Sequence, residues 1–212
     1  MISNTEFIKY LDILFENPKP ELNYSNFYEL LIAVVLSAQC TDKKVNKATE
    51  ILFKKYPNFN ALSSSKLEDI ESIVKPLGLY KTKSKNIRII ASKVIENNIN
   101  EFNMDRDLLE MMPGVGRKTA SIILSTYGVS NELGVDTHIL RVSYRLGITK
   151  TASNPLLTET SLKQFFGNQN YNKLHMQLIL FGRYICKAIK PFCTECKIKD
   201  KCNYYNSLLL NK

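Results

Sequence analysis

The sequence predicts an all-α protein, and three observations support this prediction. Apolar residues recur at intervals of three and four over most of the chain, which is the spacing of one face of a helix. Few stretches alternate polar and apolar residues with a period of two, and the tight-turn pairs Asn-Gly and Asp-Gly are absent. With 212 residues, of which 44% are hydrophobic, the chain is long enough to bury a sizeable core.

The first half of the chain carries the start signals of several helices. Ser3-x-x-Glu6 has the form of a capping box and predicts a helix that ends before Pro18. Residues 26–38 are almost all apolar, which predicts a helix buried on most sides. Three further helices are expected: one from Thr41 or Asp42 to Pro57, one from a second capping box at Ser65-x-x-Glu68, and one over residues 82–97.

The second half continues this pattern, with glycine and proline at the helix ends. Residues 105–112 and 117–127 predict two helices separated by a Pro-Gly-Val-Gly turn, and Gly128 ends the second. Asn154 followed by Pro155 is a favourable N-cap and first helical residue. The remaining helices are expected from Asp136 or Thr137 to Gly147, and from about Tyr171 to Lys187.

The excess of basic residues points to a polyanionic partner. Lys and Arg number 29 against 20 Asp and Glu, a net charge of +9, which is typical of nucleic-acid-binding proteins. Drift in an AT-rich genome would also enrich lysine. The longest apolar run, Leu30 to Leu36, is far shorter than the roughly 20 residues of a membrane span. The N-terminus has no secretory pattern, so a cytoplasmic protein without a membrane partner is expected.

Four of the five cysteines form one cluster, Cys186-x6-Cys193-x2-Cys196-x5-Cys202. In a cytoplasmic protein, clustered thiolates are typical of metal ligands rather than disulfides. Zinc sites usually pair two Cys-x2–4-Cys elements across a longer gap, and this sequence has only one such element. The spacing therefore favours a 4Fe-4S cluster, with zinc as the alternative. Cys40 stands apart and is interpreted as a small core residue.

The segment Met112-Pro-Gly-Val-Gly-Arg-Lys-Thr-Ala120 has the form of a helix–hairpin–helix. Gly114 and Gly116 would let the backbone approach a phosphate closely, and the free N–H groups of the following helix favour an anion. Such contacts hold DNA without reading its sequence. Lys118 lies in the first turn of that helix, where the dipole and partial desolvation favour a neutral, nucleophilic amine. A phosphate contact is the alternative role of Lys118.

Asp136, in Val135-Asp-Thr-His138, precedes a predicted helix and can act as a simple N-cap. The functional interpretation is a carboxylate that works opposite Lys118, shuttling protons or stabilising positive charge on a sugar. His138 is interpreted as structural, and His175 gives no clear signal.

Taken together and in this order, these motifs resemble the endonuclease III family of the helix–hairpin–helix superfamily. The resemblance spans nearly the whole chain and includes Leu36-Ser-Ala-Gln39, Leu77-Gly-Leu-Tyr80, Met-Pro-Gly-Val-Gly-Arg-Lys-Thr-Ala, Val-Asp-Thr-His-Ile-Leu-Arg and the cysteine tail. It implies two helical domains with a DNA-binding cleft between them. A six-helix barrel would comprise residues 21–130. Residues 1–20 and 131–212 would form the domain that holds the iron–sulfur loop, residues 186–202.

The resemblance implies a bifunctional DNA glycosylase and AP lyase of base-excision repair. Such an enzyme flips oxidised pyrimidines out of duplex DNA, excises them, and cleaves the abasic site by β-elimination through a lysine Schiff base. By position, Lys118 matches the family's nucleophile and Asp136 its catalytic carboxylate. The family's 4Fe-4S cluster would be held by Cys186, Cys193, Cys196 and Cys202. The expected DNA contacts are Gln39, Leu79, Gly114, Gly116, Lys187 and Lys190.

Three alternatives remain at this point. The adenine glycosylases of the superfamily typically lack a lysine at position 118 and carry a further C-terminal domain, and glycosylases without lyase activity also lack the lysine. A DNA-binding module with a redox-sensing cluster would need neither Lys118 nor Asp136.

Gly134 stands where many relatives have Ala, which puts the substrate range in doubt more than the activity. The expected partner is duplex DNA with damaged pyrimidines or abasic sites, bound by a monomer.

Overall fold

The computed structural model describes residues 2–210, and over these residues the protein is helical with no strand. The prediction of an all-α protein is therefore confirmed for the described part of the chain. Two compact units are present, one formed by Pro20–Ser130 and the other by Met1–Lys19 together with Asn131–Lys212. Each unit has its own hydrophobic core. Among the described helices, none is long and apolar enough to cross a membrane.

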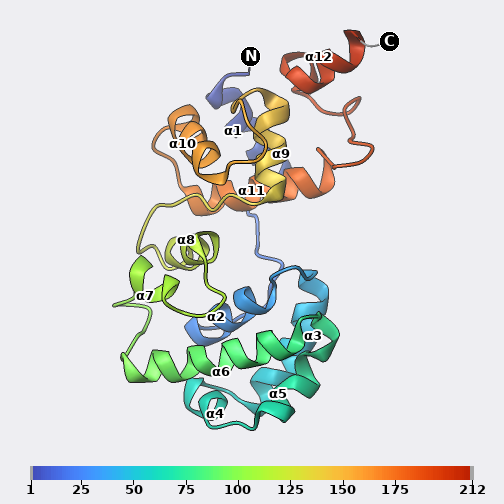
Figure 1. The fold of residues 1–212 in the computed structure, drawn as a ribbon. Coiled ribbons are helices and arrows are strands. Elements are labelled where there is room, and N and C mark those ends of the chain that lie inside the picture. The colour runs from blue at the N-terminus through green and yellow to red at the C-terminus, as the bar shows by residue number, and fades with distance from the viewer. Residues whose placement is uncertain (1, 211–212) are drawn as a thin grey trace. The chain divides into compact units, whose positions relative to one another are not determined.

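The unit of residues 20–130 is built around the apolar helix α2, in which nine of ten residues are buried (Figure 1). The long helix α6 packs against α2, α4 and α5, and α8 packs against α2 and α7. Its elements are α2 (Phe27–Leu36), α3 (Asp42–Lys55), α4 (Phe59–Ser63), α5 (Leu67–Val74), the 3-10 turn η1 (Lys75–Leu77), α6 (Tyr80–Glu96), α7 (Arg106–Glu110) and α8 (Arg117–Thr126).

In the second unit, α9 packs against α10, α11 and α12, and α1 packs against α10 and α11. The core joins the N-terminal helix to the C-terminal part of the chain, because the ring of Phe7 stacks on Phe166 and meets Phe181 edge-on. The elements are α1 (Asn4–Leu14), α9 (Thr137–Leu146), α10 (Pro155–Phe166), α11 (Tyr171–Tyr184), the 3-10 turn η2 (Lys199–Lys201) and α12 (Asn203–Leu210).

Most helix starts follow the sequence signals, and two expectations are wrong. The side chains of Ser3, Asp136 and Asn154 accept hydrogen bonds from backbone N–H groups in the first turns of α1, α9 and α10. Ser65 does not cap α5, because its hydroxyl donates to the carbonyl of Leu62 at 2.6 Å, and the N-cap position is Lys66. The helix expected to reach Lys187 ends at Tyr184, where the cysteine loop begins.

Candidate functional site

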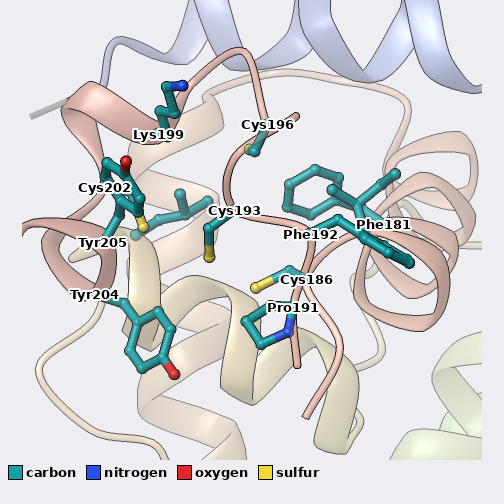
Figure 2. Close-up of a pocket in the computed structure, with 12 residues that line it drawn as sticks. Phe181, Cys186, Pro191, Phe192, Cys193, Cys196, Lys199, Cys202, Tyr204 and Tyr205 are labelled. Carbon is teal, nitrogen blue, oxygen red and sulfur yellow. The ribbon is translucent and has the colours of Figure 1, made fainter. Parts of the chain in front are cut away.

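The four clustered cysteines lie around one hollow in the loop between α11 and α12. Figure 2 shows Cys186, Cys193, Cys196 and Cys202 arranged about this hollow, which is otherwise lined mainly by apolar and aromatic side chains. In the part of the chain that the structure describes, no group of three or more His, Cys, Asp or Glu converges as the ligands of a single metal ion do.

Short-range hydrogen bonds shape this loop. The N–H of Phe192 donates to the carbonyl of Ile185 at 3.0 Å, which folds the first half of the loop back on the end of α11. In the second half, Cys196 N–H donates to Cys193 at 3.2 Å and Cys202 N–H to Lys199 at 2.9 Å. These bonds define two tight turns, residues 193–196 and residues 199–202, which contain three of the four cysteines.

Arg145, in the last turn of α9, fixes the first half of the loop. Its guanidinium donates to the carbonyls of Lys187 at 2.6 Å and Ala188 at 3.0 Å, and lies 3.5 Å from the sulfur of Cys186. The same group stacks on the ring of Tyr204, 4.2 Å from its centroid. Arg145 therefore connects α9, the loop and α12, and it places a positive charge beside a cluster of thiols.

Burial disfavours the charged form of the thiols. It raises the pKa of Cys193, Cys196 and Cys202, with the neighbouring cysteines adding to the effect. Arg145 acts in the opposite direction on the pKa of Cys193 and Cys202, but more weakly. A bound metal centre must therefore displace protons from these groups, because the thiolate is the ligand form.

The two basic residues of this loop that are expected to meet DNA differ in their exposure. Lys187 is half-buried, and its ammonium sits 4.3 Å from the centroid of the Phe192 ring. Lys190 is exposed and has a left-handed backbone, with φ +50°. Both lie within four residues of Cys186 in the sequence.

The predicted hairpin is present between α7 and α8. Gly114 takes a left-handed φ of +84°, and a Cβ there would lie 2.9 Å from Nδ2 of Asn86 on α6. Gly116 is the N-cap of α8, is extended, and has nothing within 4 Å of the position of a Cβ. Between them the buried Val115 donates its N–H to Met112 at 3.1 Å. The N-terminal end of α8 therefore carries no side chain at residue 116, and the space around that position is open.

Lys118 is exposed on the first turn of α8, two residues after Gly116. The helix that carries it is tied to α7 by Arg106. The Arg106 guanidinium donates to the hydroxyl of Ser121 at 3.1 Å and forms an ion pair with Glu110 at 2.7 Å. Gly114, Gly116 and Lys118 thus belong to one short, braced motif in the unit of residues 20–130.

Asp136 is the N-cap of α9 in the other unit. Its Oδ1 accepts from the N–H of Ile139 at 2.8 Å, so one oxygen of the carboxylate is fixed by the helix it begins. Arg141, one turn further on, donates to the carbonyls of Cys186 at 3.1 Å and Gly182 at 2.8 Å. The helix α9 therefore connects Asp136 at its start with the cysteine loop at its end.

Gln39 and Leu79 lie at two loop positions that sequence reasoning does not show to be unusual. Both are exposed, Leu79 by 63%, and both have left-handed backbones, with φ of +55° and +48°. Such conformations are uncommon for residues other than glycine and are often found at functional positions. In the first turn of α6, which follows Leu79, the buried Lys83 donates to the carbonyl of Leu77 at 3.0 Å.

Comparisons with known proteins agree with this geometry. Residues 32–167 match the family described as HhH-GPD superfamily base excision DNA repair protein. Endonuclease III of Bacillus subtilis is 42% identical over 190 residues, which is 89% of this chain and 86% of that protein. Endonuclease III of Escherichia coli is 41% identical over 190 residues, 89% of this chain and 90% of that protein.

Solved structures give the same result. A non-covalent endonuclease III–DNA complex matches with a TM-score of 0.90 and 36% identity, over 99% of this chain and 100% of that one. A trapped endonuclease III–DNA covalent intermediate matches with the same values. A thermostable thymine-DNA glycosylase, at 20% identity and a TM-score of 0.83, shares the fold. This chain belongs to the endonuclease III family of DNA glycosylases and AP lyases that act in base-excision repair.

Proposed function

We propose that this chain excises oxidised pyrimidines from duplex DNA and cleaves the resulting abasic site with Lys118 as its nucleophile. The observation that carries the proposal is the exposed Lys118 in the first turn of α8, two residues after Gly116, whose Cβ position faces open space. A phosphate held by the N–H groups of that turn would bring a neighbouring sugar within reach of the lysine. The position of Lys118 and the chemistry of its amine therefore support the same role, that of the nucleophile.

The chemistry requires a neutral amine. The Lys118 nitrogen attacks C1′ of the sugar, and the damaged base leaves with its bonding electrons and gains a proton. Opening of the sugar gives an imine, which makes the C2′ proton acidic. Removal of that proton and expulsion of the 3′ phosphate break the strand. We propose that the carboxylate of Asp136 moves protons or stabilises positive charge in these steps. Its Oδ1 caps α9, and its other oxygen is the one that we expect to act.

We further propose that Gln39 and Leu79 occupy the space left by the flipped nucleotide. Both are exposed and have left-handed backbones, Gln39 in the loop between α2 and α3 and Leu79 at the N-cap of α6. Gly114, Gly116, Lys187 and Lys190 would contact the phosphate backbone. Such contacts carry little sequence preference, as suits an enzyme that must find damage at any position.

The cysteine loop fits a 4Fe-4S cluster held by Cys186, Cys193, Cys196 and Cys202. Zinc sites usually pair two Cys-x2–4-Cys elements across a longer gap, whereas this loop has one such element with a single cysteine on either side, so the spacing favours the cluster over zinc. When bound, the cluster would supply a covalent link among four points of the loop. Iron and acid-labile sulfide in equal amounts support this assignment, and zinc without sulfide contradicts it.

Trapping of the imine tests the central proposal. Protein is incubated with a duplex that has one abasic site, in the presence of borohydride, which reduces an imine to a stable amine. We expect a covalent adduct with wild type and with Lys54→Gln, an exposed lysine of the same unit. We expect none with Lys118→Gln. An adduct that persists in Lys118→Gln would assign the nucleophile to another amine, and no adduct from folded wild type would remove the lyase.

The partner that we propose is duplex DNA with oxidised pyrimidines or abasic sites, bound by a monomer in the cytoplasm. The alternative is a DNA-binding protein with a redox-sensing cluster and no chemistry. It is favoured if Lys118→Gln and Asp136→Asn bind an abasic duplex as wild type does and wild type neither excises nor cleaves.

A further inference from the structure

The segment that leads into α9 has no regular secondary structure, yet it includes Asp136. Over residues 131–136 the backbone is neither helical nor paired. Leu133 and Val135 are buried in the core of this unit, and Gly134 between them is buried as well. A buried backbone carbonyl in such a segment needs a donor from elsewhere.

His175 supplies that donor. Its Nδ1 lies 2.7 Å from the carbonyl oxygen of Gly134, and the side chain is only 5% exposed. A carbonyl can only accept, so the Nδ1 atom carries the proton. The histidine belongs to α11, 41 residues along the chain, so the bond ties the segment to a different helix.

A second polar contact, made by Asn131, joins the beginning of the segment to the N-terminal end of α11. Asn131 donates to the carbonyl of Gln169 at 2.8 Å and accepts from the N–H of Tyr171 at 3.0 Å. Asn131 thus holds the beginning of the segment at the start of α11. His175, one helical turn after Tyr171, holds Gly134. The path from Asn131 to Asp136 is therefore set at two points along the same helix.

We infer that His175 is a positioning residue for Asp136, an inference that rests on the catalytic role proposed above for that carboxylate. Gly134 precedes Asp136 by two residues, and Asp136 is fixed on its other side by its bond to Ile139 N–H. The carboxylate is therefore held between the helix it begins and the irregular segment that His175 anchors. Without His175, the buried Gly134 carbonyl loses its donor, and the chain must shift to recover one.

Two substitutions separate the hydrogen bond from the size of the side chain. His175→Asn places an amide N–H close to the position of Nδ1, whereas His175→Leu fills similar space without a donor. We expect His175→Leu to slow single-turnover excision of thymine glycol from a duplex by about tenfold to a hundredfold, the scale of a small misplacement of a reacting group. We expect His175→Asn to recover most of that rate. The dissociation constant for a duplex with a tetrahydrofuran abasic analogue should stay unchanged in both.

Gln177 on the same helix provides a matched control. It is 2% exposed and donates to Asp12 and to the carbonyl of Phe15, so it anchors α1 rather than the segment before α9. Gln177→Leu should lower the melting temperature while leaving the excision rate near that of wild type. Equal slowing by Gln177→Leu and His175→Leu would reduce the effect to general destabilisation and overturn the inference.

Asp136→Asn distinguishes failure of this inference from failure of the proposed function. If His175 acts through Asp136, His175→Leu causes no further slowing in an Asp136→Asn background. If Asp136→Asn excises as fast as wild type, the proposed role of Asp136 is wrong. If Asp136→Asn is slow and folded His175→Leu is as fast as wild type, the carboxylate keeps its role and the positioning role is overturned. Should His175→Leu fail to fold, His175→Gln, whose donor lies beyond the Nδ1 position, replaces it and must be slower than His175→Asn.

Discussion

The two hairpin glycines should separate stability from DNA binding. Gly114 has a φ of +84°, and a left-handed backbone costs a residue with a Cβ about 1–2 kcal/mol. A Cβ there would also come within 2.9 Å of Nδ2 of Asn86, but that atom ends a flexible side chain and can rotate away. Gly116 has a φ of −98° and open space around the Cβ position. Glycine at position 114 is therefore favoured by its left-handed backbone, whereas at position 116 we expect glycine to leave space for a phosphate.

Gly114→Ala should lower the free energy of unfolding by about 1–2 kcal/mol, nearly all of it from the backbone. At roughly 2–4 °C per kcal/mol for a chain of this length, the melting temperature falls by about 2–8 °C. Gly116→Ala should change stability by less than about 0.5 kcal/mol. Its methyl group would instead stand between the first turn of α8 and a phosphate. We expect its affinity for an abasic duplex to fall about tenfold or more, the value of one charge-assisted hydrogen bond.

Thermal unfolding followed by circular dichroism measures the first effect, and fluorescence anisotropy with a labelled duplex measures the second. Combining Gly114→Ala with Asn86→Ala removes the close contact and should recover only a small part of the loss. An unchanged melting temperature for Gly114→Ala would refute the backbone argument. Wild-type affinity for Gly116→Ala would refute the idea that phosphate approaches this glycine.

Three further predictions rest on single side chains. Burial lowers the pKa of Lys83, so the folded state releases this proton before the unfolded chain does, and stability rises with pH up to about 10.5, the ordinary value. Urea unfolding should therefore show the difference between wild type and Lys83→Met shifting in favour of wild type as the pH rises from neutral toward that value, and a constant difference would contradict this. Arg145→Gln loses hydrogen bonds to two loop carbonyls and the contact with the Tyr204 ring. A chelator should therefore remove the iron of the proposed cluster faster than from wild type, whereas the exposed Lys150→Gln should behave as wild type. Asn154→Ala removes the 3.0 Å cap of α10 and should lower the free energy of unfolding by about 1 kcal/mol, with Asn154→Asp restoring most of it in the same assay.

Helix starts could be predicted where the signal and its partner lie three residues apart. The caps at Ser3, Asp136 and Asn154 are of this kind, since each side chain accepts from an N–H within the next turn. The failure at Ser65 has a local cause as well. The short helix α4 ends just before it, and the carbonyls of its last turn accept from groups that follow the helix. The N–H and the hydroxyl of Ser65 therefore both donate backward to Leu62, and the hydroxyl does not cap α5.

The elements that sequence reasoning missed lack the pattern it depends on. Helix α4 has five residues, too few for a hydrophobic stripe to repeat. Helix α12 buries none of its residues, so its sequence shows no face that must be covered. The left-handed backbones of Gln39 and Leu79 are also invisible in the sequence, because neither residue type prefers that conformation and only the surrounding loop imposes it.

The same distinction applies to the candidate site. Its features could be predicted from the sequence where the interacting residues lie close together along the chain, and could not where they lie far apart. The cysteine spacing predicts a shared metal site because the four thiols belong to one loop of 17 residues, and the Gly-x-Gly turn predicts the hairpin because its glycines are adjacent to the helix they serve. The contacts that would hold these groups in place act over much longer separations: Arg145 to Cys186 and His175 to Gly134 each span 41 residues. No periodicity or spacing rule links positions so far apart, which is why His175 gives no signal in the sequence. The groups that would do the chemistry are therefore readable from local patterns, whereas the groups that would position them emerge only when the chain is folded.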